Sequence, residues 1–171
     1  MADPVDVPGL ADLRRQIDAV DSQLLELLNR RSRLSLAVGE AKSHTPGAKV
    51  FDPAREAALL DGLAARNPGP LTSTHIVAIW REIMSASRAL QKPCTVAYLG
   101  PEGTFSYFAG VAFLGNSMTF IPCRDFADIF RKVHTGECDM GIVPLENSIY
   151  GTIVQGLDLF SQSPVRIQAE F

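Results

Sequence analysis

The first long segment of the chain carries a regular apolar stripe with a helical period. Its members recur in alternating steps of four and three residues, the 3.5-residue spacing that packs one helix against another. Arg31 interrupts this stripe, and a guanidinium stays charged at ordinary pH and is costly to bury without a partner. We therefore expect an anion, either a structural glutamate or a ligand, to meet Arg31 inside a helical bundle. The apolar members are Leu13, Ile17, Val20, Leu24, Leu27, Leu34, Val38 and Ala41.

Three helices are predicted in residues 1–92. The first, over residues 10–42, contains no proline and would be ~50 Å long at about 1.5 Å per residue. This exceeds the diameter of such a small domain, so we expect another chain to cover much of the apolar stripe. Asp52, followed by proline at the first helical position, begins a second helix that ends before residues 67–70. A third helix begins near Thr72 or Ser73.

The hydrophobic period changes after residue 92. Strands alternating with helices favour an α/β domain with a largely parallel sheet. Residues 1–92 and 93–171 are therefore predicted to be two domains, and the second is short enough to be incomplete. Strands are predicted at residues 95–99, 118–121, 139–143 and 165–169, and helices from Ser106, over residues 125–134 and over residues 153–160.

Composition and charge exclude several classes of protein. The chain has 171 residues, 46% of them hydrophobic, and a net charge of −3, so neither domain has the basic excess of a nucleic-acid binder. No signal peptide and no apolar run near the ~20 residues of a membrane span are visible, so we expect a cytoplasmic protein without membrane contact. Scattered Cys94, Cys123 and Cys138 indicate reduced thiols. Ligand spacings for a metal site are missing, so no metal is expected.

Polar residues occupy apolar faces on all three predicted helices. Lys42 lies eleven residues after Arg31 and faces the same side of the first helix. Glu56 shares a face with leucines of the second helix, while Ser87 and Gln91 continue an apolar face of the third. Each residue alone could be solvated or locally paired, for instance Arg31 with Glu56. Together they are difficult to reconcile with a core built only for stability.

Arg14 raises a geometric question. It lies seventeen residues before Arg31, or ~25 Å along a continuous helix, so one small ligand cannot contact both on the same helix. If Arg14 is functional, it would serve the pocket of a second subunit whose first helix runs antiparallel. The alternative is an ordinary surface arginine.

Five ordered motifs link the helical segment to a known family. They are residues 13–18 with Asp21, Arg30-Arg31, residues 38–42, residues 52–56, and Ser87 with Gln91. In these motifs residues 1–92 resemble the all-helical chorismate mutases, whose three-helix protomers form an intertwined dimer. The resemblance implies the Claisen rearrangement of chorismate to prephenate, a pericyclic reaction that needs no cofactor, nucleophile or proton donor. An enzyme of this kind holds a compact conformer of a dicarboxylate and stabilises the ether oxygen, which gains negative charge as the C–O bond breaks.

The resemblance also implies roles for five catalytic residues. Arg31, together with Arg14 of the partner chain, would clamp the two substrate carboxylates, and bidentate geometry is available to each. Lys42 and Gln91 would face the ether oxygen. Glu56 would hold the ring hydroxyl.

Three further residues of the helical segment would bind the substrate. Asp52 would help to hold the ring hydroxyl, although it is also a good N-cap. Ser87 and Arg55 would complete the surroundings of a carboxylate, and Arg55 could equally be structural because it lies in the first turn of its helix.

The second segment resembles the start of prephenate dehydratase, which converts prephenate to phenylpyruvate with loss of water and carbon dioxide. Residues 96–106 resemble its first strand and glycine-rich turn, and residues 141–148 with Gly151 resemble its Glu-Asn-Ser loop. Without the resemblance, these stretches are a strand–turn–helix signal and a turn that could simply be capped. The family's Thr-Arg-Phe motif and its regulatory domain do not occur here, so the chain looks like an N-terminal portion of the bifunctional enzyme with an incomplete dehydratase step. Candidate substrate-binding residues are Thr104, Ser106, Glu146, Asn147 and Ser148.

The expected architecture is therefore an all-α three-helix domain followed by a partial α/β lobe of the periplasmic-binding-protein type. The expected partners are chorismate, prephenate and a second copy of the chain that pairs through the first helix. The alternative is a non-catalytic helical dimerisation module with a truncated small-molecule-binding lobe, which solvent-facing Lys42 and Gln91 would favour. A DNA-binding regulator is disfavoured by the near-neutral helical part.

Overall fold

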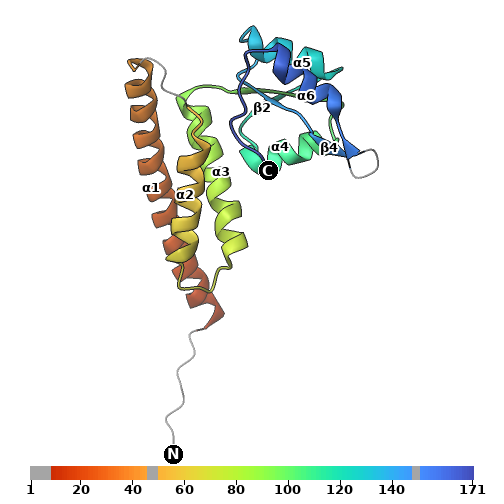
Figure 1. The fold of residues 1–171 in the computed structure, drawn as a ribbon. Helices are drawn as coiled ribbons and strands as arrows, with labels where there is room; N and C mark the ends of the chain where they lie inside the picture. Colours follow the sequence, from red (N-terminus) through yellow and green to blue (C-terminus); the bar gives the residue numbers. More distant parts are fainter. Residues whose placement is uncertain (1–8, 46–49, 148–150) are drawn as a thin grey trace, which may run out of the picture.

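The computed structural model describes residues 9–45, 50–147 and 151–171, and begins with three helices (Figure 1). These are α1 (Leu10–Ser43), α2 (Pro53–Ala65) and α3 (Ser73–Gln91), which confirms the three predicted helices. The predicted Asp52 N-cap of α2 is confirmed, and Thr72 is found to cap α3. The Asp52 carboxylate accepts a hydrogen bond from the Arg55 backbone N–H at 3.0 Å, and the Thr72 hydroxyl accepts one from the His75 backbone N–H at 3.2 Å.

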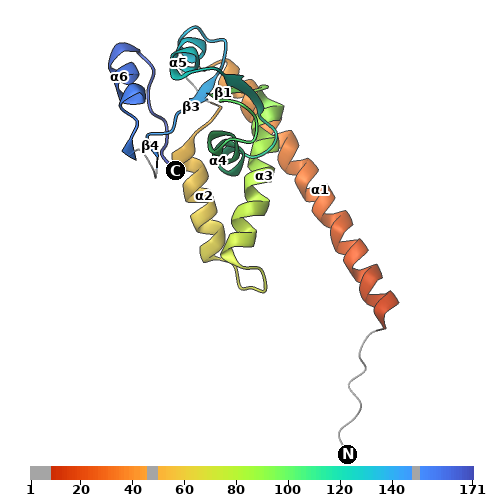
Figure 2. The same ribbon diagram turned by 90° about the vertical axis from the view of Figure 1, so that its right-hand side faces the viewer.

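Helix α1 has 34 residues and buries none of them within the chain. It packs mainly against α3, and its N-terminal part extends away from α2 and α3 (Figure 2). Members of the apolar stripe are consequently open to solvent: Ile17 is 58% exposed, Leu24 51% and Leu27 59%. No other described part of the chain covers this stripe.

The second half of the chain is a three-stranded parallel sheet with helices. Its elements are β1 (Thr95–Leu99), α4 (Phe105–Leu114), β2 (Thr119–Cys123), α5 (Phe126–His134) and β3 (Met140–Ile142), and the strand order is β2-β1-β3. Both ladders are parallel, with Val96 of β1 opposite Phe120 of β2 and Met140 of β3. The predicted alternation of strands and helices is thereby confirmed.

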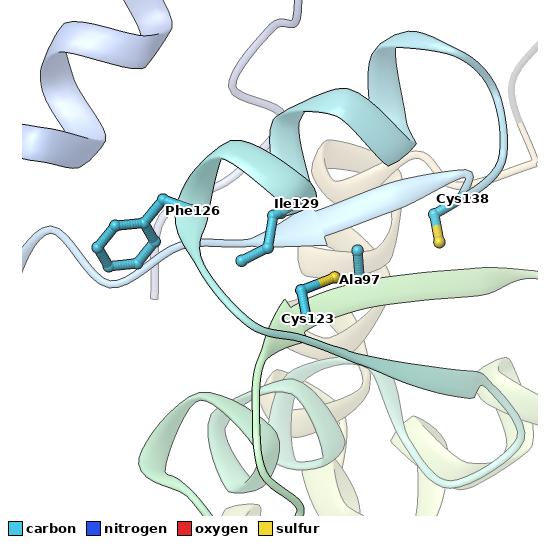
Figure 3. Close-up of a cluster of buried hydrophobic side chains, with 5 residues drawn as sticks. All are labelled: Ala97, Cys123, Phe126, Ile129 and Cys138. Carbon is cyan, nitrogen blue, oxygen red and sulfur yellow. The ribbon is translucent and has the colours of Figure 1, made fainter.

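The buried core of this half lies on both faces of β1. Ala97 points toward α5, where it packs with Cys123 and Ile129 (Figure 3). Val96 points to the opposite face and packs with Leu114 of α4 and with Met118. The alternation of neighbouring residues between two apolar layers explains why β1 reads as a continuous apolar run.

The C-terminal part departs from the prediction in two places. Strands β4 (Glu146–Asn147) and β5 (Gly151–Thr152) form an antiparallel pair that was not predicted, before α6 (Val154–Gln162). The predicted strand at residues 165–169 is wrong, because this segment pairs with no strand in the described part of the chain. Its end is held by side chains instead, since the Phe171 ring stacks on Phe113 of α4 at 4.1 Å between centroids.

The three cysteines are free thiols. Burial raises the pKa of Cys94 to about 11 and that of Cys123 to about 11, because a thiolate is poorly solvated in an apolar interior. Over the described ranges, no helix combines the length and hydropathy that crossing a membrane requires.

Candidate functional site

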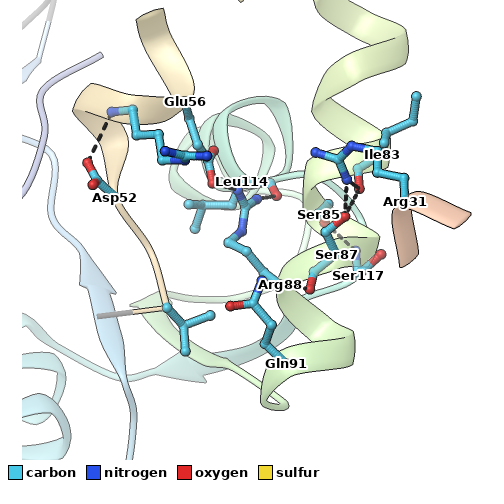
Figure 4. A network of polar contacts seen from close by, with 12 residues as sticks. Arg31, Asp52, Glu56, Ile83, Ser85, Ser87, Arg88, Gln91, Leu114 and Ser117 are labelled. Carbon is cyan, nitrogen blue, oxygen red and sulfur yellow. Dashed lines mark hydrogen bonds and ion pairs between the residues drawn. The ribbon is translucent and has the colours of Figure 1, made fainter. Parts of the chain in front are cut away.

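Arg31 of α1 reaches α3 (Figure 4). Its guanidinium Nη1 donates to the Ser87 hydroxyl and, at 3.4 Å, to the Ile83 carbonyl. Burial lowers the pKa of Arg31, and the nearby charge of Glu56 opposes this shift. Among the described residues, Arg31 forms no ion pair with a carboxylate. A partly buried cation is thus held by neutral oxygens alone.

Ser87 and Gln91 continue this polar cluster along α3. The Ser87 side chain is 7% exposed, and its hydroxyl donates to the Ile83 carbonyl at 2.8 Å. The Gln91 amide nitrogen donates to the Ser87 carbonyl at 3.2 Å. The Gln91 Oε1 is buried and has no hydrogen-bond partner within the described part of the chain. An amide with an unused buried oxygen is unusual in a region that serves only stability.

Lys42 stands at the other end of the same α1 face. It is half-buried, and its ammonium donates to the Val50 carbonyl at 3.4 Å. Neither Lys42 nor Gln91 is fully solvent-exposed, so the condition that would favour a non-catalytic module does not hold.

Glu56 does not pair with Arg31. Its carboxylate accepts a hydrogen bond from Nη1 of Arg88, a buried α3 residue that is 3% exposed. Sequence reasoning did not single out Arg88, because the α3 face was followed through Ser87, one position earlier. Met84 and Ser85 are buried beside it on α3, but this burial is a feature of the structure and gave no signal in the sequence.

The remaining predicted residues of the helical region lie outside this cluster. Asp52 is exposed and caps α2, which is the structural role that the sequence left open for it. Arg55 in the first turn of α2 is also exposed. Arg14 is exposed on the N-terminal part of α1 and is not brought near Arg31 within one chain.

Two of the five candidate residues of the α/β half line one cavity. A cavity of about 520 Å³ is lined by Ser106 and Glu146, together with residues of β3 and of the C-terminal segment. Thr104 caps α4, and its hydroxyl donates to the Leu99 carbonyl at 3.0 Å. Of Asn147 only the backbone in β4 is described, and Ser148 lies outside the described residues.

The polar cluster on α1 and α3 offers groups that bind an anion. It offers the Arg31 guanidinium and the Lys42 ammonium on one face of α1, with hydroxyl and amide groups of α3 beside them. Guanidinium and ammonium groups recognise carboxylates. Over the described ranges, no three His, Cys, Asp or Glu residues are grouped so as to hold a metal ion.

Comparison with known proteins divides the chain at the same place as the fold. Residues 13–92 match the family described as chorismate mutase type II, and residues 96–171 match the prephenate dehydratase family.

Similar proteins named bifunctional chorismate mutase/prephenate dehydratase match almost the whole chain. The protein from Aquifex aeolicus is 38% identical over 165 residues, which is 94% of this chain and 45% of the relative. The protein from Pseudomonas aeruginosa is 40% identical over 169 residues, 96% of this chain and 46% of the relative. The protein from Escherichia coli K12 is 33% identical over 180 residues, with 94% and 46% covered. The chain thus spans about half the length of these curated relatives.

Proposed function

We propose that the chain catalyses the rearrangement of chorismate to prephenate, because residues 13–92 match the chorismate mutase type II family and residues 96–171 match the prephenate dehydratase family. The observation that carries the proposal is the partly buried Arg31 guanidinium, which neutral oxygens hold and which forms no ion pair with a carboxylate of the described residues. A substrate carboxylate would supply the missing charge.

The proposed reaction needs only positioning and electrostatic stabilisation. One C–O bond breaks and one C–C bond forms within the same molecule, so no group enters or leaves. Arg31 binds one substrate carboxylate, and Ser87 and Arg55 complete the surroundings of that carboxylate. Lys42 and Gln91 face the ether oxygen. Cations fixed where negative charge develops stabilise the transition state more than the ground state. Glu56 and Asp52 hold the ring hydroxyl.

The second carboxylate requires Arg14 from another copy of the chain. Arg14 and Arg31 lie too far apart along one helix for a single small ligand, so an antiparallel pair of α1 helices would bring Arg14 of one chain to Arg31 of the other. A two-fold axis would then pass near residues 22 and 23, midway between the two arginines. The uncovered stripe around Leu24 supports this homodimer, because it places apolar side chains at that axis.

Residues 93–171 form, in this proposal, part of a prephenate-binding domain, with the domain boundary at residues 92 and 93. Thr104, Ser106, Glu146, Asn147 and Ser148 are proposed to contact prephenate, and the cavity beside Ser106 and Glu146 supports this assignment. The mutase product is the substrate of the dehydratase relatives, so the two domains would perform successive steps toward phenylalanine in the cytoplasm.

Chorismate consumption tests the proposal. The absorbance of chorismate is followed with the wild-type chain and with Arg31→Ala, and the product is identified as prephenate. Arg33→Ala is the matched control, since Arg33 is an exposed arginine two residues away on the same helix. We expect rapid turnover by the wild type and by Arg33→Ala, and a loss of at least about 10³-fold in kcat/KM for Arg31→Ala. Full activity of Arg31→Ala would refute the site.

A further inference from the structure

Arg88 is the only charged residue among the described ones that is buried, with 3% of its surface exposed. Its guanidinium lies 5.3 Å from the centre of the Phe51 ring, a cation–π contact. Nη1 donates to the Glu56 carboxylate, and Nη2 donates to the backbone carbonyl of Leu114 (Figure 4). A buried cation is therefore held by one carboxylate, one carbonyl and an aromatic face.

The two hydrogen-bond acceptors belong to different halves of the chain. Glu56 lies on α2, in the proposed mutase site, whereas Leu114 is the last residue of α4 in the α/β half. Carbonyls at the end of a helix lack intrahelical partners and carry partial negative charge, so this end of α4 is a suitable acceptor for a guanidinium. Arg88 thus connects Glu56 directly to the α/β half.

The turn that follows Leu114 is fixed on the same face of α3. The Ser117 backbone N–H donates to the Ser85 hydroxyl at 3.0 Å, and the Asn116 side-chain amide donates to the Glu82 carboxylate at 2.9 Å. Glu82, Ser85 and Arg88 follow one another at intervals of three residues and so share one face of the helix.

Gly115 makes this close approach possible. Its φ is +82°, and a Cβ there would lie 2.5 Å from the Cβ of Ser85. A side chain at this position would be strained and would also push the turn away from α3.

We propose that Arg88 is a positioning residue for the mutase reaction. Arg88 holds the Glu56 carboxylate toward the substrate and makes that orientation depend on the position of the turn at residues 114–117 of the α/β half. This inference rests on the proposed function. Glu56 is proposed to bind the ring hydroxyl of chorismate, and a carboxylate fixed by a buried guanidinium has fewer orientations to lose on substrate binding. The packing of the α/β half therefore influences the rate of the mutase.

A double-mutant cycle on the full chain separates positioning from a direct or purely structural role. The kcat and KM for chorismate are measured for Arg88→Met and Glu56→Ala, singly and together, with Arg81→Met as the matched control on α3. If Arg88 acts through Glu56, Arg88→Met should lower kcat/KM by about 10- to 100-fold in the wild-type background and by less than about 2-fold in the Glu56→Ala background. Circular dichroism verifies that each variant is folded.

A second pair of variants tests the link to the α/β half without touching Arg88. Gly115→Ala should lower kcat/KM several-fold. Gly136→Ala, whose φ is +75° and whose Cβ would meet nothing within 4 Å, should leave it unchanged.

Three results would overturn the inference. The first is unchanged kinetics of Arg88→Met, and the second is an equal loss for this substitution in both backgrounds. The third is equal activity of the two glycine variants. If the wild-type chain is active, any of these results overturns only the inference about Arg88. If the wild-type chain shows no turnover, the proposed function is overturned as well.

Discussion

Replacing Leu24 by glutamate should dissociate the proposed dimer. Leu24 lies on the exposed stripe of α1, close to the proposed two-fold axis, and is 51% exposed in the single chain. Because glutamate forms helices nearly as well as leucine, α1 should remain intact in the variant.

The expected loss of association free energy can be worked out from this exposure. Burying a whole leucine contributes about 1.5–3 kcal/mol, so covering the exposed half of Leu24 contributes about 1 kcal/mol per chain. The substitution occurs twice in a symmetric dimer, which doubles the loss to about 2 kcal/mol. An unpaired carboxylate in the interface adds a desolvation cost of at least about 1 kcal/mol per chain. A total of about 4 kcal/mol raises the dimer Kd by about 10³-fold.

Sedimentation velocity over a range of protein concentrations measures this change. The control is Leu36→Glu, because Leu36 is similarly exposed at 49% and lies about 120° further round the helix, away from the stripe. We expect Leu24→Glu to sediment as a monomer and to lose mutase activity on dilution, while Leu36→Glu remains dimeric and active. A dimeric Leu24→Glu, or an equally dissociated Leu36→Glu, would refute the placement of the interface.

Three further predictions concern single side chains. Lys42→Gln should lower kcat by about 10²-fold or more and change KM less, as steady-state kinetics would reveal, because the ammonium is proposed to stabilise charge that develops in the transition state. Burial alone would raise the pKa of Asp139, but hydrogen bonds from Lys92 and Thr95 outweigh this effect, so the pKa lies below its usual value. This carboxylate therefore stabilises the fold above about pH 4 and loses that contribution as the pH falls through its lowered folded pKa. Asp139→Asn should accordingly lower the free energy of unfolding in urea by up to about 1 kcal/mol at pH 7, and by progressively less below pH ~4. An equal loss at pH 7 and below pH ~4 would contradict this role of Asp139. Since burial raises the pKa of Cys94 to about 11, its thiol should react slowly with a disulfide reagent at pH 7.5 and rapidly once the chain is unfolded.

The regular elements could be predicted because local patterns determine them. The 3.5-residue period of α1, the Asp52 cap of α2 and the apolar run of β1 each contain their structural information within a few residues. The exposed stripe was also expected, since a helix of 34 residues is longer than the unit it belongs to.

What could not be predicted depends on contacts between distant parts of the chain. Arg88 is buried because the end of α4 meets α3 and accepts its hydrogen bond, and no periodicity in α3 reveals that meeting. Glu56 pairs with Arg88 rather than with Arg31 for the same reason. Residues 165–169 have the composition of a strand, but a strand also needs a partner, and here the ring of Phe171 packs on Phe113 instead.

The activity of mixed dimers tests the central claim, a mutase site shared between two chains. Arg14→Ala and Arg31→Ala are each assayed alone, then unfolded together in equal amounts, refolded and assayed again. A mixed dimer contains one site with both arginines and one with neither, so random pairing should restore about a quarter of the wild-type activity from two inactive variants. Recovery of that activity is the result we predict. Two variants that remain inactive after mixing, although they form dimers, would contradict the shared site.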